Sequence, residues 1–86
     1  MRNLEIGIRD TVTIGNLVAR SQAKRLCNQL KNARQVVLDF DDISDIGQGY
    51  AHELFVVFAK QHPDIKLETK NTSRQVERMI NHVKKS

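Results

Sequence analysis

The residues most able to do chemistry lie in one segment, where the apolar run at 36–40 leads through an acidic stretch into Gly47-Gln48-Gly49. Glycines before a helix can let backbone N–H groups approach a phosphate. Here, however, four carboxylates precede the glycines, and no lysine or arginine lies nearby in sequence: Asp39, Asp41, Asp42 and Asp45. A phosphate would meet like charge unless a metal or distant bases intervened. We therefore interpret the glycines as supplying unusual backbone angles for a tight entry into a helix.

A second interpretation of this segment is phosphoryl transfer. Asp39-Phe40-Asp41 resembles the Asp-x-Asp of haloacid-dehalogenase-type phosphotransferases, in which one carboxylate attacks a phosphoryl group and both help to hold magnesium. That chemistry also needs a cationic clamp and further carboxylates on later strands, and the later strand at 65–69 offers only Glu68. A small Mg-dependent phosphoryl-transfer or nucleotide-binding protein using Asp39 and Asp41 remains the alternative hypothesis.

The other chemically capable side chains form no recognisable site. His52, His62 and His82 show neither metal-ligand spacing nor an adjacent nucleophile, and the single cysteine, Cys27, cannot form an internal disulfide. We expect no catalytic residue, no metal site and no cofactor. His52 and the neighbouring Glu53 fall outside the apolar pattern and are most simply surface residues.

Charge is segregated along the chain. Residues 11–38 contain five bases and no acid, and residues 39–53 contain five acids and no base. Such a dipolar chain can steer a complementary protein, whereas a uniformly basic chain would suggest nucleic acid. The basic helix face near residues 24–32 lacks interleaved aromatic residues, so we do not expect nucleic acid as a partner.

Hydrophobic spacing predicts the elements that must position this segment. Eighty-six residues make one α/β domain, 1–86, with a short mixed sheet and about three helices. We expect an N-terminal β-hairpin over 4–14 that turns at Arg9-Asp10, a helix capped by Ser21, a central strand at 36–40, a helix ending at His62-Pro63, a strand at 65–69 and a last helix after 71–73. The predicted core stripes are Ala23, Leu26, Cys27 and Leu30; Ala51, Leu54, Phe55 and Phe58; and Val76, Met79, Ile80 and Val83. No apolar run approaches a membrane span or a signal-peptide core, which predicts a cytoplasmic protein without membrane association.

The chain resembles a known family in this central region. The run from Val36 to Leu54 is similar to the central signature of STAS domains, the domains of sulphate transporters and anti-sigma factor antagonists. Residues 20–26, together with 47–55, more closely resemble a bacterial STAS-like family of unknown function. The resemblance implies a STAS-like fold and a regulatory role in binding an ATP-binding kinase-like regulator.

In the anti-sigma factor antagonists that the chain resembles, this loop normally reads Asp-Ser-Ser-Gly. A kinase phosphorylates the second serine of that motif. Gly47 replaces the aspartate, Gln48 the first serine, Gly49 the phosphoacceptor serine and Tyr50 the glycine. Glycine cannot carry the phosphate charge of about −1.5 to −2 on which such a switch depends. Ser44 and Ser21 are other candidate acceptors, although exposed and capping serines are common.

We therefore predict a non-catalytic regulatory module that binds a protein partner through the loop and helix at 41–53, without the usual phosphoacceptor. Gln48, Tyr50, His52 and Glu53 are the strongest candidates for contacts, with Gly47 and Gly49 shaping the backbone. A self-associated form is an alternative, through an apolar contact of Tyr50 beside Ala51. The complete predicted set is Asp41, Asp42, Ser44, Asp45, Gly47, Gln48, Gly49, Tyr50, His52 and Glu53.

Overall fold

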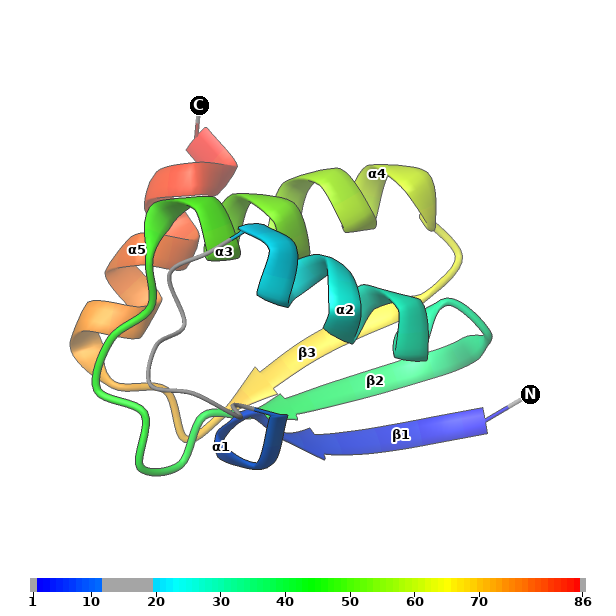
Figure 1. Cartoon of the computed structure of the whole chain (residues 1–86), viewed down its shortest axis with the longest axis horizontal. Coiled ribbons are helices and arrows are strands. Elements are labelled where there is room, and N and C mark those ends of the chain that lie inside the picture. The colour runs from blue at the N-terminus through cyan, green and yellow to red at the C-terminus, as the bar shows by residue number, and fades with distance from the viewer. Residues whose placement is uncertain (1, 12–19, 86) are drawn as a thin grey trace.

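A computed structural model of the protein describes residues 2–11 and 20–85. Helices lie over one face of a small sheet (Figure 1). The elements follow one another as β1 (Arg2–Gly7), α1 (Ile8–Thr11), α2 (Arg20–Leu30), β2 (Ala33–Asp39), α3 (Gln48–His52), a π-helical segment η1 (Glu53–Val57), α4 (Phe58–Gln61), β3 (Lys66–Lys70) and α5 (Arg74–Lys85).

In the part of the chain that the structure describes, the sheet has three strands in the order β1-β2-β3, and both neighbouring pairs are parallel. The predicted central strand is β2, whose Leu38 lies opposite Ile6 of β1 and Thr69 of β3. Val36 and Leu38 are fully buried beneath the helices. Because parallel strands end at the same edge, the loops after β1, β2 and β3 are brought together at one end of the sheet.

The predicted N-terminal hairpin is wrong. β1 pairs in parallel with β2, and Arg9 and Asp10 lie in the helical turn α1 rather than in a hairpin turn. The alternation that suggested a hairpin ends at Ile8, which is fully buried and anchors this turn, and Thr11 Oγ1 donates to Ile8 O at 2.7 Å. The proposed return strand at 12–14 lies outside the described residues. Over residues 2–11 and 20–85 the sheet is parallel, whereas a mixed sheet was predicted.

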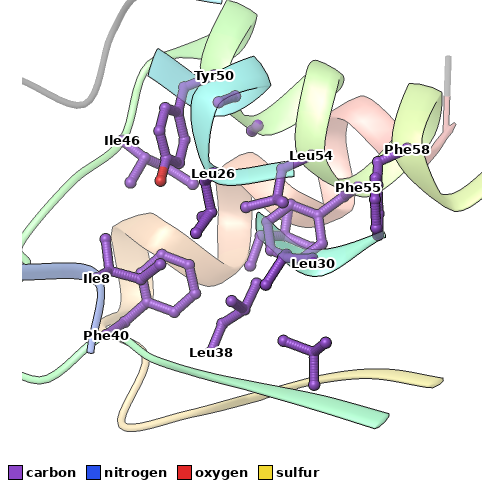
Figure 2. Packing of buried hydrophobic residues seen from close by; sticks show 14 of the residues in the cluster. Ile8, Leu26, Leu30, Leu38, Phe40, Ile46, Tyr50, Leu54, Phe55 and Phe58 are labelled. Carbon is purple, nitrogen blue, oxygen red and sulfur yellow. The ribbon is translucent and has the colours of Figure 1, made fainter. Parts of the chain in front are cut away.

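The helical core matches the predicted stripes closely. α3, η1 and α4 form one continuous helical stretch over 48–61, and its predicted stripe of Ala51, Leu54, Phe55 and Phe58 is buried. The stretch stops at His62 before Pro63, as predicted. Figure 2 shows Phe40 and Ile8 at the loop end of this core and Phe58 at the other end.

The outer helices complete the core. In α5, Val76, Ile80 and Val83 are buried and Met79 is partly buried. In α2, Ala23, Leu26 and Leu30 are buried, and Cys27 packs partly against the core. Ser21 lies inside the first turn of α2, which begins at Arg20, so it does not occupy the predicted cap position. No helix in the described ranges is both long enough and apolar enough to cross a bilayer.

Candidate functional site

The candidate site is the loop that connects β2 to α3. It leaves the C-terminal edge of the parallel sheet and passes the beginning of α5 before it enters α3 (Figure 1). This edge is where α/β folds commonly place their binding residues. Its first residues stay close to the sheet, because Phe40 N donates to Lys70 O at 3.0 Å and Ile43 N donates to Phe40 O at 3.0 Å.

Asp39 caps this loop. Its Oδ1 accepts a hydrogen bond from Asp41 N and another from Asn71 Nδ2, each at 3.0 Å. The Asn71 side chain is the larger cause, and the Asp41 amide the next, of a pKa of Asp39 below its ordinary value. Asn71 adopts a left-handed φ of 57°. Asp39 therefore joins the loop after β2 to the turn after β3.

Ser73 fastens the middle of the loop to α5. Its hydroxyl donates to Ser44 O at 2.8 Å and accepts from Val76 N at 3.1 Å. The second bond is an N-cap of α5. One hydroxyl thus holds both the helix start and the loop.

Apolar side chains hold the loop from beneath. Ile46 is 3% exposed, and Ile43 packs against the core from a partly exposed position. Asp42 lies between them and the strand with a left-handed φ of 64°, and its carboxylate pairs with Arg9. The backbone of the loop is therefore positioned by buried isoleucines on one side and by polar bonds on the other.

The predicted contact residues divide into three groups by accessibility. Five side chains are exposed: Asp41, Asp42, Ser44, Asp45 and Gln48. Three residues are intermediate: Gly47, Gly49 and His52. Two are buried: Tyr50 and Glu53. The exposed group is interrupted by Ile43, Ile46 and Gly47 and extends to Gln48, the first residue of α3.

Tyr50 faces the core rather than a partner. It is 1% exposed, and Figure 2 shows its ring beside Ile46 and Leu26. Ala51 is also fully buried. These two residues therefore do not form the exposed apolar surface through which a second copy was expected to bind. Burial raises the pKa of Tyr50 to about 12, partly offset by the nearby Thr11 hydroxyl. That hydroxyl donates to Ile8 O, and among the described residues the Tyr50 hydroxyl has no well-formed hydrogen bond.

Glu53 takes part in a charged cluster between α2 and the following helix. Arg20 Nη1 lies 3.2 Å from Glu53 Oε1 and 3.3 Å from His52 Nδ1. The Glu53 side chain is 9% exposed, while that of Arg20 is 50% exposed. Burial, and then the charge of Glu53, raise the pKa of Cys27 to about 11. The expectation that Glu53 is a surface residue is therefore wrong, and Arg20 is a residue of this cluster that the sequence did not indicate.

The glycines shape the site less than the sequence suggested. Gly47 is the N-cap of α3 with φ −78° and ψ 159°, an extended conformation open to any residue, and it makes no side-chain capping bond. Gly49 lies within α3. The left-handed angles in this region belong instead to Asp42 and Asn71.

The geometry gives little support to the alternative use of Asp39 and Asp41 in magnesium chemistry. Asp39 Oδ1 is already shared by two hydrogen bonds. Within residues 2–11 and 20–85, no group of three or more histidine, cysteine, aspartate or glutamate residues is placed to hold a metal ion. What the loop offers is a row of exposed polar side chains on a fixed backbone.

Comparison with known proteins gives one match. Residues 22–77 match the STAS-like domain of unknown function (DUF4325). This range includes most of α2, the sheet strands β2 and β3, the entire candidate loop and the first turn of α5. No curated protein and no solved structure matches the chain.

Proposed function

We propose that this chain, which belongs to the family of STAS-like domains of unknown function, is a non-catalytic regulatory module that binds a protein through its 41–53 loop–helix surface. The family match supports a regulatory role in general terms. The observation that carries the proposal is the construction of the loop, which presents five exposed polar side chains between Asp41 and Gln48 on a backbone held from both sides. A rigid surface binds with less ordering cost than a mobile one.

The chemistry of the surface indicates the kind of partner. Asp41 and Asp45 are exposed, and neither carboxylate has a basic partner among the described salt bridges. Gln48 follows at the first residue of α3 and adds an amide that can donate and accept hydrogen bonds. We expect the partner to present a basic surface here. An ATP-binding kinase-like regulator is the partner class that the resemblance to anti-sigma factor antagonists suggests.

Site-specific photo-crosslinking in the native host tests the surface. A photoreactive amino acid at Gln48 should capture a defined protein, while the same group at exposed Lys31, beside the opposite end of β2, should not. The captured protein is then purified and its ATP binding and its affinity for the chain are measured. Asp45→Lys should weaken that affinity at least about tenfold. Placing like charges opposite each other in an interface costs several kcal/mol, and about 1.4 kcal/mol corresponds to a tenfold change in Kd.

Lys31→Glu is the matched control, because it reverses one exposed charge outside the surface. Equal capture from both positions, or an affinity that Asp45→Lys leaves unchanged, would show that the partner binds elsewhere. If the captured protein does not bind ATP, the binding surface is supported, but an ATP-binding kinase-like regulator is excluded as the partner class.

A further inference from the structure

The edge of β3 is an unpartnered part of the sheet. Among the described residues, β3 pairs with β2 alone, so its other side is open. A groove of about 610 Å³ runs along this strand beneath α4 and α5. Its apolar lining is Phe55, Ala59, Pro63, Ile65, Leu67 and Ile80. Exposed sheet edges commonly pair with another strand unless they are protected.

The backbone of β3 is oriented for such pairing. Lys70 directs its carbonyl toward β2, where it accepts from Phe40 N. Because successive residues of a strand direct their backbone groups to opposite sides, Leu67 and Thr69 direct theirs toward the open edge. The row ends at Ile65, whose N–H already donates to His62 O at 3.1 Å. The free edge is therefore short and centred on Leu67.

We propose that this edge binds the same edge of a second copy, antiparallel, about a two-fold axis at Leu67. In this register Lys66 lies opposite Glu68 of the second copy. The symmetry repeats this pair, so both charged residues that flank Leu67 in β3 meet an opposite charge. Leu67 meets itself on the face that carries the apolar groove, which extends the two grooves into one another.

Neighbouring registers are disfavoured by the same charges. A two-fold axis at Glu68 would place Glu68 opposite itself and Lys66 opposite Lys70, and an axis at Lys66 would place Lys66 opposite itself. Like charges directly opposite each other are destabilising. Shifts by one residue are incompatible with a two-fold antiparallel pair, because they oppose residues from different faces of the sheet.

Within one chain Lys66 is the more exposed of the two paired residues, while Lys70 Nζ is already 2.8 Å from Glu5 Oε2 of β1. Lys66 Nζ is 3.9 Å from Glu68 Oε1, and the Lys66 side chain is 71% exposed. Glu68 also accepts from Gln35 Nε2 at 2.7 Å, which fixes its carboxylate above the outer face of the sheet. The β1 edge offers no comparable match: an axis at its Leu4 would place Asn3 opposite Glu5 and Arg2 opposite Ile6. The proposed surface shares no residue with the 41–53 loop–helix surface.

Charge reversal with rescue tests the register. Sedimentation velocity on the purified full chain should show concentration-dependent association from 9.9 kDa to twice that mass below about 1 mM, the weak end of specific affinities. Lys66→Glu should raise the dimer Kd at least about tenfold, because two attractive cross-strand pairs become repulsive. Lys66→Glu combined with Glu68→Lys should restore the wild-type Kd within about threefold, since both pairs are re-formed.

Arg2→Glu is the matched control, an identical reversal on the β1 edge, and should leave the Kd unchanged. The proposal is overturned by a chain that stays monomeric over this range, by a dimer indifferent to Lys66→Glu, by an equal effect of Arg2→Glu, or by a double variant that fails to recover. Thermal melts of each variant at low concentration separate dissociation from unfolding. If the chain is monomeric but a photoreactive group at Gln48 still captures a defined protein, only the dimer is overturned and the proposed function stands.

Discussion

Ser73 is the residue whose replacement best tests how the candidate loop is held. Its hydroxyl makes two bonds of different purpose: it accepts from Val76 N to cap α5 and donates to Ser44 O to hold the loop. Ser73→Ala removes both. A lost N-cap costs about 1 kcal/mol and a lost neutral hydrogen bond about 0.5–1.5 kcal/mol. Because Ser73 is partly exposed and water can replace some of this bonding, we expect a total of about 1–2 kcal/mol.

A second variant separates the two bonds. Ser73→Asp retains an oxygen that can accept from Val76 N and adds a negative charge at the helix N-terminus, which is favourable. It has no proton to donate to Ser44 O. Ser73→Asp should therefore keep most of the stability while it loosens the loop, and Ser73→Ala should reduce both.

Two measurements distinguish these outcomes. Thermal denaturation should place Ser73→Ala about 5–15 °C below the wild type, since a domain of this size loses about 4–8 °C per kcal/mol, and Ser73→Asp within a few degrees of it. Hydrogen exchange should then show faster exchange of amides in 41–46 in both variants. The reasoning is refuted if Ser73→Asp exchanges like the wild type in this loop, because the bond to Ser44 would then not hold it.

Three further predictions concern groups whose environments are unusual. Tyr50→Phe should leave the melting temperature unchanged or raised, because the buried hydroxyl has no well-formed partner among the described residues. Tyr50→Ala should instead reduce the free energy of unfolding by about 3–5 kcal/mol. A clearly lower melting temperature for Tyr50→Phe would show that the hydroxyl makes a stabilising hydrogen bond, contrary to the geometry. Asn71→Gly, which keeps the left-handed backbone, should raise the pKa of Asp39 toward its ordinary 3.8 in a carboxyl NMR titration. Since the folded pKa is depressed, the stability that Asp39 contributes is present above that value and lost as pH falls through the folded pKa, and an unchanged titration would exclude Asn71 as the cause. Cys27, with a pKa raised from 9.0 to about 11, should be alkylated at pH 8 about 100-fold more slowly than in the urea-unfolded chain, with a faster rate in Glu53→Gln; equal rates in folded and unfolded chains would contradict the raised pKa.

The elements with a clear internal period were predictable. The stripes containing Leu54 and Ile80 match their predicted spacing because a helix that covers one face of a sheet repeats its buried positions every three or four residues. The central position of β2 followed from its nearly continuous apolar run. In both cases the burial pattern of a single element carried the signal.

The hairpin could not be distinguished from the true N-terminal structure by the same means. Leu4, Ile6 and Ile8 alternate whether the chain continues as a strand or turns into α1, because the buried Ile8 satisfies either pattern. Pairing of β1 with β2 is a contact between distant segments, and no local period records it. The ion pair of Arg20 with Glu53 could not be predicted for the same reason, since it depends on how α2 is rotated against the following helix.

The sequence correctly indicated unusual backbone angles near this loop, but the residues predicted to adopt them were the wrong ones. Unusual backbone angles were assigned to the glycines, whereas Asp42 and Asn71 adopt them. Aspartate and asparagine enter the left-handed region more readily than other non-glycine residues. Gly47 instead marks a helix start without a side-chain cap. Gly47 thus leaves α3 without a capping side-chain oxygen, and Gly49 leaves it without a hydroxyl at the phosphoacceptor position, but neither glycine is needed for an unusual backbone angle.

That absence leads to a prediction about how the surface is regulated. α3 has no hydroxyl at Gln48 or Gly49, but the preceding loop carries Asp41 and Asp45 exposed. The loop therefore carries negative charge without a phosphate, and binding to a basic partner should respond to ionic strength. Between low salt and 1 M salt the Debye length falls from about 10–30 Å to about 3 Å, so we expect affinity for the captured partner to fall progressively.

Asp41→Asn with Asp45→Asn isolates this contribution. Asparagine retains an oxygen that can accept the bond that Ile46 N makes to Asp45 Oδ1 at 2.9 Å, so the loop should keep its shape while it loses two charges. The double variant should bind more weakly at low salt and with a flatter salt dependence. If it binds as tightly as the wild type and responds equally to salt, the acidic loop does not steer the partner, and its aspartates serve only to shape the turn.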